Sequence, residues 1–143
     1  MDFLQNYENR SIRTISICFC FLNLTHTEER KLYEIQEKMS EAPFQIRQSY
    51  VFGDQTVNAT EFYEFRPGFY TKIEAADVRY PAHEALLLAA GMMEKESQTW
   101  EEDNTHRNLL VIIGEEPASD PSYEKIKHWI CERKQTPFDL LSL

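Results

Sequence analysis

The sequence predicts an α/β fold: a Rossmann-like three-layer sandwich on a mostly parallel five-stranded sheet with one antiparallel edge hairpin. Two uncharged stretches, residues 14–22 and residues 109–113, are typical of strands buried on both faces. Segments with helical spacing alternate with the predicted strands, as they do where helical crossovers join parallel strands. We therefore expect residues 14–22 and 109–113 to lie side by side and point the same way.

The length of 143 residues is that of one ordinary domain. The residues are 42% hydrophobic and 13% aromatic, which is enough apolar side chain for a packed core. We expect a polar lead-in over residues 1–12 and a single α/β domain over residues 13–143.

The first half of the chain contains three predicted strands and one helix. Residues 14–22 are β-branched and aromatic without a charge, which predicts the first strand. A helix follows over residues 28–39, capped by Thr25 with Glu28 or by Thr27 alone. Residues 45–52 and 57–65 predict two more strands, and their short connection favours an antiparallel hairpin.

The second half predicts further helices and two more strands. Residues 69–77 suggest a short helix, and Pro81 suits the first position of a strong helix that continues to residue 96. This helix is apolar nearly all round, so we expect the sheet to cover it. After the strand at 109–113, Asp120 caps a helix that opens at Pro121, and residues 138–143 predict a final short strand.

The charge and the cysteines limit the class of partner. The net charge of -9 disfavours nucleic acid and anionic membrane surfaces, which are themselves negative. The longest apolar stretch, residues 15–24, is half of the roughly twenty residues that span a bilayer, and no secretory signal precedes it. We expect Cys18, Cys20 and Cys131 to be reduced and mostly buried in a cytoplasmic protein.

Glycine placement argues against a nucleotide site. Phosphate-binding loops need glycines where a strand turns into a helix, and residues 23–27 contain none. A dinucleotide site or a P-loop is therefore not expected.

Several segments together resemble the von Willebrand factor type A domain. Residues 17–27 are similar to the family's first strand and its Asp-x-Ser-x-Ser turn, with Asn23, Thr25 and Thr27 on that motif. Residues 49–54 resemble the second strand and its hairpin, and residues 80–90 the helix before the fourth strand. Residues 110–117 resemble that strand and its acidic loop. The resemblance covers residues 14–143, and the chain stops one strand and one helix short of the family's usual domain.

The resemblance implies a cation site at the carboxyl ends of the strands. Its oxygen donors would be Asn23, Thr25, Thr27 and Glu115, holding Mg²⁺ or another divalent cation that bridges to a partner protein. The site is eroded, because Asn23 replaces the leading Asp and Glu115 replaces an Asp. Asp77 and Arg79 lie near the family's middle-loop threonine, and Glu116 follows Glu115; we expect these three residues to bind the partner protein.

A second candidate surface is aromatic. Aromatic side chains next to an arginine are enriched at protein interfaces. The residues of this cluster that we expect to bind a partner are Phe62, Phe65, Phe69 and Tyr70.

We therefore expect a non-enzymatic protein-interaction module whose partner is another protein or a second copy of the chain. No catalytic residues are identified, and the chain is not expected to be an enzyme. One alternative is a small hydrolase or transferase using Thr25 or Thr27 with His26 and Glu115. The other is a structural subunit that docks through its aromatic edge or its C-terminal strand.

Overall fold

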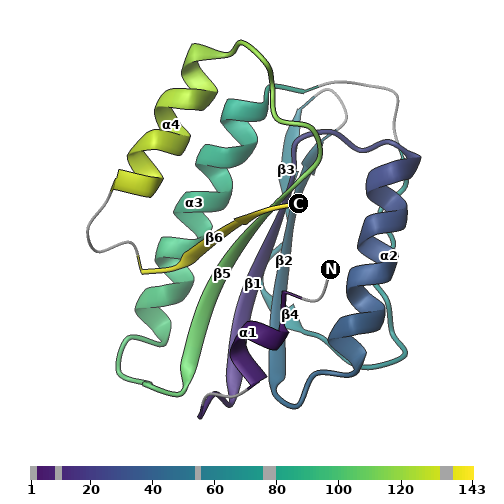
Figure 1. The fold of residues 1–143 in the computed structure, drawn as a ribbon, viewed down its shortest axis with the longest axis vertical. Helices are drawn as coiled ribbons and strands as arrows, with labels where there is room; N and C mark the ends of the chain where they lie inside the picture. The colour runs from purple at the N-terminus through teal and green to yellow at the C-terminus, as the bar shows by residue number, and fades with distance from the viewer. Residues whose placement is uncertain (1–2, 9–10, 54–55, 76–79, 133–136) are drawn as a thin grey trace.

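The computed structural model describes residues 3–8, 11–53, 56–75, 80–132 and 137–143. Its sheet has the order β3-β2-β1-β5-β6, with β4 also paired to β2 (Figure 1). The strands are β1 (Thr14–Phe21), β2 (Gln45–Gly53), β3 (Val57–Ala59), β4 (Tyr63–Glu64), β5 (His106–Ile113) and β6 (Asp139–Ser142). The helices are α1 (Gln5–Glu8), α2 (His26–Ser40), α3 (Ala82–Thr99) and α4 (Pro121–Glu132). The predicted α/β class with a mostly parallel sheet is confirmed.

The central pair of strands is the one expected from the two uncharged stretches. β1 and β5 are parallel, with Thr14 opposite His106 and Phe21 opposite Ile113. β2 lies on the other side of β1, also parallel, and β6 continues the parallel order beyond β5. β3 and β4 pair with β2 in the antiparallel sense, which supplies the expected antiparallel edge.

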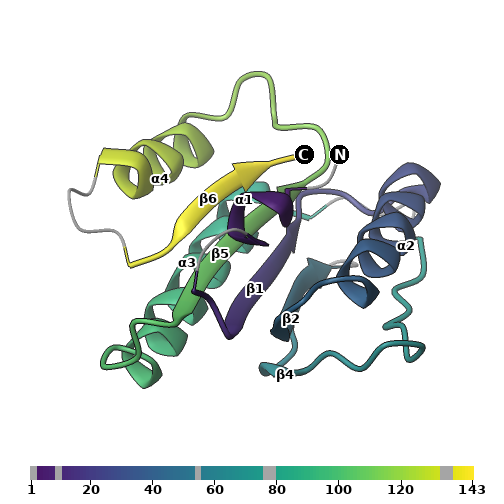
Figure 2. The same ribbon diagram turned by 60° about the horizontal axis from the view of Figure 1, so that its bottom comes forward.

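Helices cover both faces of the sheet and make three layers. Figure 1 and Figure 2 show α2 on one side and α3 with α4 on the other. The alternation of β1 divides its side chains between the two layers: Ile17 and Phe19 pack on the α2 side, and Cys18 and Cys20 on the α3 side. All four side chains are fully buried, as expected of a strand covered on both faces.

The structure differs from the sequence-based expectation in the first residues and along the β2 edge. The lead-in carries a short helix, α1, and Tyr7 is buried in the core on the α2 side. The strand predicted over residues 57–65 is broken into β3 and β4. The helix predicted over residues 69–77 is wrong over its described part, because residues 70–75 form no helix.

Two further differences concern the start of β5 and a cysteine. β5 begins at His106, three residues before the predicted start, because its first residues continue the pairing with β1. Cys18 and Cys20 are free and buried as expected, whereas Cys131 is exposed on α4. No described helix has the length and apolarity needed to span a bilayer.

Residues 70–75 form a strap that runs alongside α2, from Gln36 toward Glu29. Gln36 is 1% exposed and hydrogen-bonds the strap as a neighbouring strand would. Its side-chain amide donates to the Thr71 carbonyl at 2.9 Å and accepts from the Thr71 N–H at 2.6 Å. Glu29 accepts from the Ala75 N–H at 3.1 Å. Side chains of α2 therefore satisfy backbone groups that a helix over 69–77 would have satisfied internally.

We predict that Gln36→Leu destabilises the protein by about 1–3 kcal/mol, because it leaves both backbone groups of Thr71 without their partner. Chemical denaturation would measure the free energy of unfolding, and amide hydrogen exchange would report faster exchange at Thr71. Gln45→Leu, at an exposed position on β2, is the control. Unchanged exchange at Thr71 in Gln36→Leu would contradict this role of Gln36.

Candidate functional site

A hollow of about 450 Å³ lies where β1 and β5 end. The connection after β1 leads to β2 on one side, and the connection after β5 leads to β6 on the other. Open α/β sheets bind ligands at such a switch point, outside the carboxyl ends of the strands. We call it the carboxyl-end hollow; it is lined by Leu22, Asn23, Tyr80, Pro81, Ala82, Glu115, Glu116, Pro117, Ala118 and Asp120.

Asn23 and Gly114 meet at this hollow. Gly114 has a φ of +112°, and a Cβ placed on it would collide with Asn23 Oδ1. Only glycine adopts this backbone conformation without strain and leaves room for the Asn23 side chain. Asn23 Oδ1 is buried and has no hydrogen-bond partner among the described residues, so the hollow contains an unused acceptor.

Three carboxylates line the same hollow, and they differ in their hydrogen-bond and ion-pair partners and in their exposure. Glu116 pairs with Lys127 at 2.5 Å and accepts from the Ser142 hydroxyl at 3.0 Å. Asp120 caps α4 by accepting from the Tyr123 N–H at 3.1 Å, as the sequence predicted. Glu115 is exposed beside them. Glu115 is therefore the carboxylate of the three that faces solvent most openly.

The two predicted threonine ligands are not among the residues that line the hollow. Thr25 is the N-cap of α2 in a full capping box with Glu28: its backbone N–H donates to Glu28 at 2.9 Å, and its hydroxyl donates to the same carboxylate. Burial raises the pKa of Glu28, but the hydrogen bonds from Thr25 outweigh it, so the pKa lies below its usual range. Thr27 is exposed in the first turn of α2.

The predicted cation ligands are thus only partly brought together. Asn23 and Glu115 share the hollow, whereas Thr25 is engaged in the cap. Asp77 and Arg79 lie outside the described residues. Within the described ranges, no three His, Cys, Asp or Glu side chains cluster as a metal site. Waters can complete the six or more oxygen ligands of a hard divalent cation, and of the predicted protein donors Asn23 and Glu115 line the hollow.

The predicted aromatic residues are divided between the two faces of the sheet. Phe62 packs on the α3 side, whereas Phe65 is buried on the α2 side and stacks on Tyr70 with ring centroids 6.3 Å apart. Phe69 is 75% exposed. These side chains therefore do not form one continuous surface.

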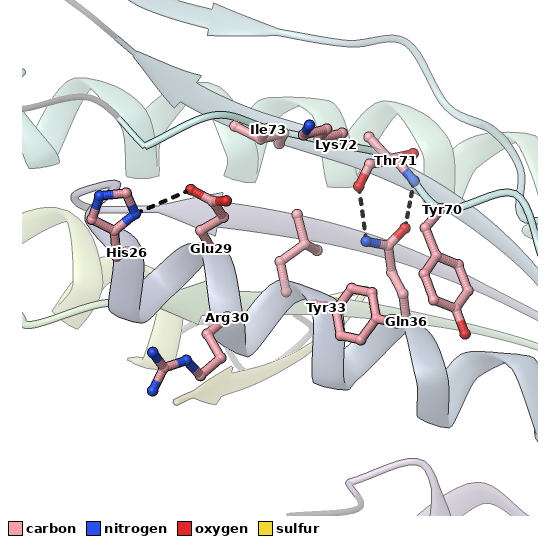
Figure 3. A pocket seen from close by; sticks show the side chains of 10 residues that line it. His26, Glu29, Arg30, Tyr33, Gln36, Tyr70, Thr71, Lys72 and Ile73 are labelled. Atoms are coloured by element: carbon pink, nitrogen blue, oxygen red, sulfur yellow. Dashed lines mark hydrogen bonds and ion pairs between the residues drawn. The ribbon is translucent and has the colours of Figure 1, made fainter.

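Tyr70 lines a groove of about 570 Å³ between α2 and the strap (Figure 3). Tyr33, which is 56% exposed, meets Tyr70 edge-to-face at 5.5 Å. At the other end of the groove, His26 lies 3.6 Å from Glu29. His26 thus faces Glu29 rather than the Thr25 hydroxyl, which has Glu28 as its acceptor.

The sequence analysis missed a buried polar cluster at the amino ends of the strands. Ser16 on β1 donates to Glu96 Oε2 on α3 at 2.5 Å, and its Oγ lies 3.0 Å from His106 Nε2 on β5. Arg47 on β2 reaches the same carboxylate through Nε at 2.8 Å and through Nη2 at 3.3 Å. The one signal in the sequence is that Ser16 interrupts an apolar strand.

This cluster has the residue types of a Ser–His–acid triad but not its arrangement. Ser16 is fully buried, and its proton goes to Glu96 rather than to His106. Burial raises the pKa of Glu96, but hydrogen bonds from Arg47 and Ser16 outweigh it and hold the pKa below its usual range. Glu96 therefore stays ionised and paired, and the cluster joins three strands to α3.

His106 is 5% exposed and stacks on Trp100, with ring centroids 4.3 Å apart. Burial lowers its pKa below the ordinary value of 6.5, although the contacts with Asn108 and Glu96 act in the opposite direction. The ring is therefore neutral at pH 7.

Comparison with known proteins adds no family: the sequence matches no protein-family model and no curated protein.

We predict that Gly114→Ala costs about 1–3 kcal/mol, because it forces a strained backbone conformation and displaces Asn23. Gly91→Ala is the matched control, since a Cβ at Gly91 meets no atom within 4 Å and alanine favours the helix by about 0.5–1 kcal/mol. Thermal and chemical unfolding of both variants would measure the two free energies. A Gly114→Ala variant as stable as wild type would show that Asn23 can move without cost.

A second prediction concerns acid sensitivity. The folded pKa of His106 is lowered, so the unfolded chain binds more protons as the pH falls below about 6.5, and stability is lost on acidification. The pKa of Glu96 is also lowered in the folded protein, so further stability is lost below about pH 4.5. Urea titrations between pH 7.5 and 5.5 should therefore give a flatter profile for His106→Gln than for wild type. His128→Gln, on the exposed side of α4, should keep the wild-type slope; identical slopes for His106→Gln and wild type would refute the assignment.

Proposed function

We propose that this chain is a non-enzymatic protein-interaction module that binds its partner at the carboxyl-end hollow. In this proposal it resembles a von Willebrand factor type A domain with an eroded cation site. The observation that carries the proposal is the buried, unpartnered Asn23 Oδ1 at the switch point between β1 and β5.

The hollow favours a partner group that donates hydrogen bonds and carries positive charge. Asn23 Oδ1 accepts only, and Glu115 beside it is an exposed carboxylate. Pro81, Ala82 and Pro117 add small apolar surface around these acceptors. A lysine or arginine side chain on a loop of the partner matches this combination, and the net charge of -9 attracts such a loop from a distance.

The groove beside α2 supports a second candidate, docking as a structural subunit. Tyr33, a large aromatic side chain that is 56% exposed, lines this groove together with Tyr70. Exposed aromatic residues are enriched among the residues that dominate binding energy. This surface would act independently of Asn23 and Glu115, so the two candidates can be separated by mutation.

The proposal is tested by selecting peptides from a displayed random library on the purified chain and measuring affinities by fluorescence anisotropy. We expect peptides rich in lysine or arginine that lose affinity by about tenfold, or 1.4 kcal/mol, on Glu115→Lys or Asn23→Ala. Glu124→Lys, an equal charge reversal on the exposed side of α4, should change affinity much less. Peptides that lose binding only on Tyr33→Ala would instead assign the interface to the groove.

The cation implied by the resemblance has its own measurement. Calorimetric titration with MgCl₂, MnCl₂ or CaCl₂ detects a cation site directly, with Asn23→Ala as the control variant. Binding heat that disappears in Asn23→Ala would restore the cation-bridged mode of binding. Peptide affinities insensitive to Glu115, Asn23 and Tyr33 would remove both interaction surfaces.

A further inference from the structure

A second hollow, of about 440 Å³, lies at the opposite end of the central strands. We call it the amino-end hollow; it lies beside the start of β5 and the end of α3, and its lining includes Glu94, Trp100, Glu101, Asp103, His106 and Pro137. We propose that this hollow binds a guanidinium group, either of a small molecule or of an arginine side chain. The proposal is independent of the carboxyl-end hollow.

The first argument is charge. The described lining of the hollow contains the carboxylates Glu101 and Asp103, and neither lysine nor arginine; Glu94, which also lines it, has an interaction of its own. Three cations among the described residues lie near the hollow. Arg47 pairs with Glu96, and the Arg107 guanidinium donates to the carbonyls of Asn104 and His106, both at 2.8 Å. Arg13 is exposed, and its charge adds to the hydrogen bonds from Thr105 that lower the pKa of Asp103. α3 also ends here, and the negative end of its dipole favours a cation within the last turn.

The second argument is the protonation of His106. Ser16 Oγ lies 3.0 Å from His106 Nε2 but gives its proton to Glu96, so toward His106 it can only accept. Asn108 Oδ1, 3.3 Å from the same nitrogen, also accepts only, and the Asn108 amide nitrogen donates to the Pro137 carbonyl. Nε2 therefore carries the proton of the neutral ring.

It follows that Nδ1 of His106 is a lone-pair acceptor. His106 is 5% exposed, and its Nδ1 is buried without a hydrogen-bond partner among the described residues. Buried acceptors are normally satisfied, by protein or by a bound group. An N–H of a ligand in the amino-end hollow would satisfy this nitrogen.

The third argument is the geometry of Asp103. Its Oδ1 accepts from the Thr105 N–H at 2.8 Å and from the Thr105 hydroxyl at 2.6 Å. These two hydrogen bonds lower the pKa of Asp103, so the group is a carboxylate at neutral pH. Oδ2 is left to a ligand. A guanidinium presents five N–H donors in a planar fork, which can reach a carboxylate and a ring nitrogen at once, whereas an ammonium is a compact point charge.

The test uses the full chain labelled with ¹⁵N. Long-range ¹H–¹⁵N correlation spectra resolve the two ring nitrogens of each histidine, and His106→Gln assigns the signals of His106. We expect the free protein to show the Nε2–H tautomer of His106. Titration with butylguanidine, a free guanidinium, or with acetyl-Gly-Arg-Gly-amide should shift the Nδ1 resonance to a saturating end point. A response to both probes indicates a small cation site, and a response to the peptide alone indicates an arginine presented by a partner.

Substitution distinguishes a built site from general attraction to an acidic protein. Glu101 is exposed, so Glu101→Gln leaves the buried cluster intact. This variant should lower the affinity for the guanidinium probe by about fivefold or more. Glu124→Gln, an exposed neutralisation on α4, should not weaken it. The proposal is overturned if His106 shows the Nδ1–H tautomer, if neither probe moves its Nδ1 signal, or if the two variants lose affinity equally. Butylamine, which carries an ammonium on the same chain and the same single charge, should bind more weakly than butylguanidine at equal ionic strength.

Discussion

Parallel pairing of β1 with β5 is the constraint on which the rest of the structure depends. The two strands keep one register from Thr14 opposite His106 to Phe21 opposite Ile113, and both are buried on their two faces. Because the pair is parallel, the loops that follow the two strands meet at one end, and the residues that begin them meet at the other. Both candidate binding hollows arise from this arrangement, one at each end of the same pair.

The two ends of the β1–β5 pair are stabilised by different interactions. At the carboxyl end the backbone must turn away sharply, and Gly114 accepts a φ of +112° so that Asn23 fits against it. At the amino end a buried carboxylate must be neutralised: Glu96 is held by Arg47 and Ser16, and a buried charge without such partners would strongly destabilise the fold. The amino end is therefore stabilised by a polar network and the carboxyl end by close backbone packing.

The α2 side of the sheet shows how a segment without regular structure can be held in place. The strap at residues 70–75 runs alongside α2, and Gln36 supplies one donor and one acceptor to Thr71, as a neighbouring strand would. This arrangement creates the groove lined by Tyr33 and Tyr70 and separates Phe65, which is buried, from Phe69, which is exposed. A contiguous run of aromatic residues in the sequence thus contributes to the core, to a groove and to the surface.

The sequence alone was enough to predict the α/β class, the parallel central pair and the antiparallel edge, because each depends on local composition or on the length of the connections between elements. It reduced the cap of α2 to two alternatives, Thr25 with Glu28 or Thr27 alone, and the structure has the first. The strap was not predictable, since its backbone is satisfied by Gln36, some 35 positions away. Nor was the cluster of Ser16, Glu96 and His106, whose members come from three elements up to 90 positions apart. Tertiary structure decided these features because hydrogen bonding between distant segments leaves no periodicity in the sequence, whereas burial of a strand or a helix face does.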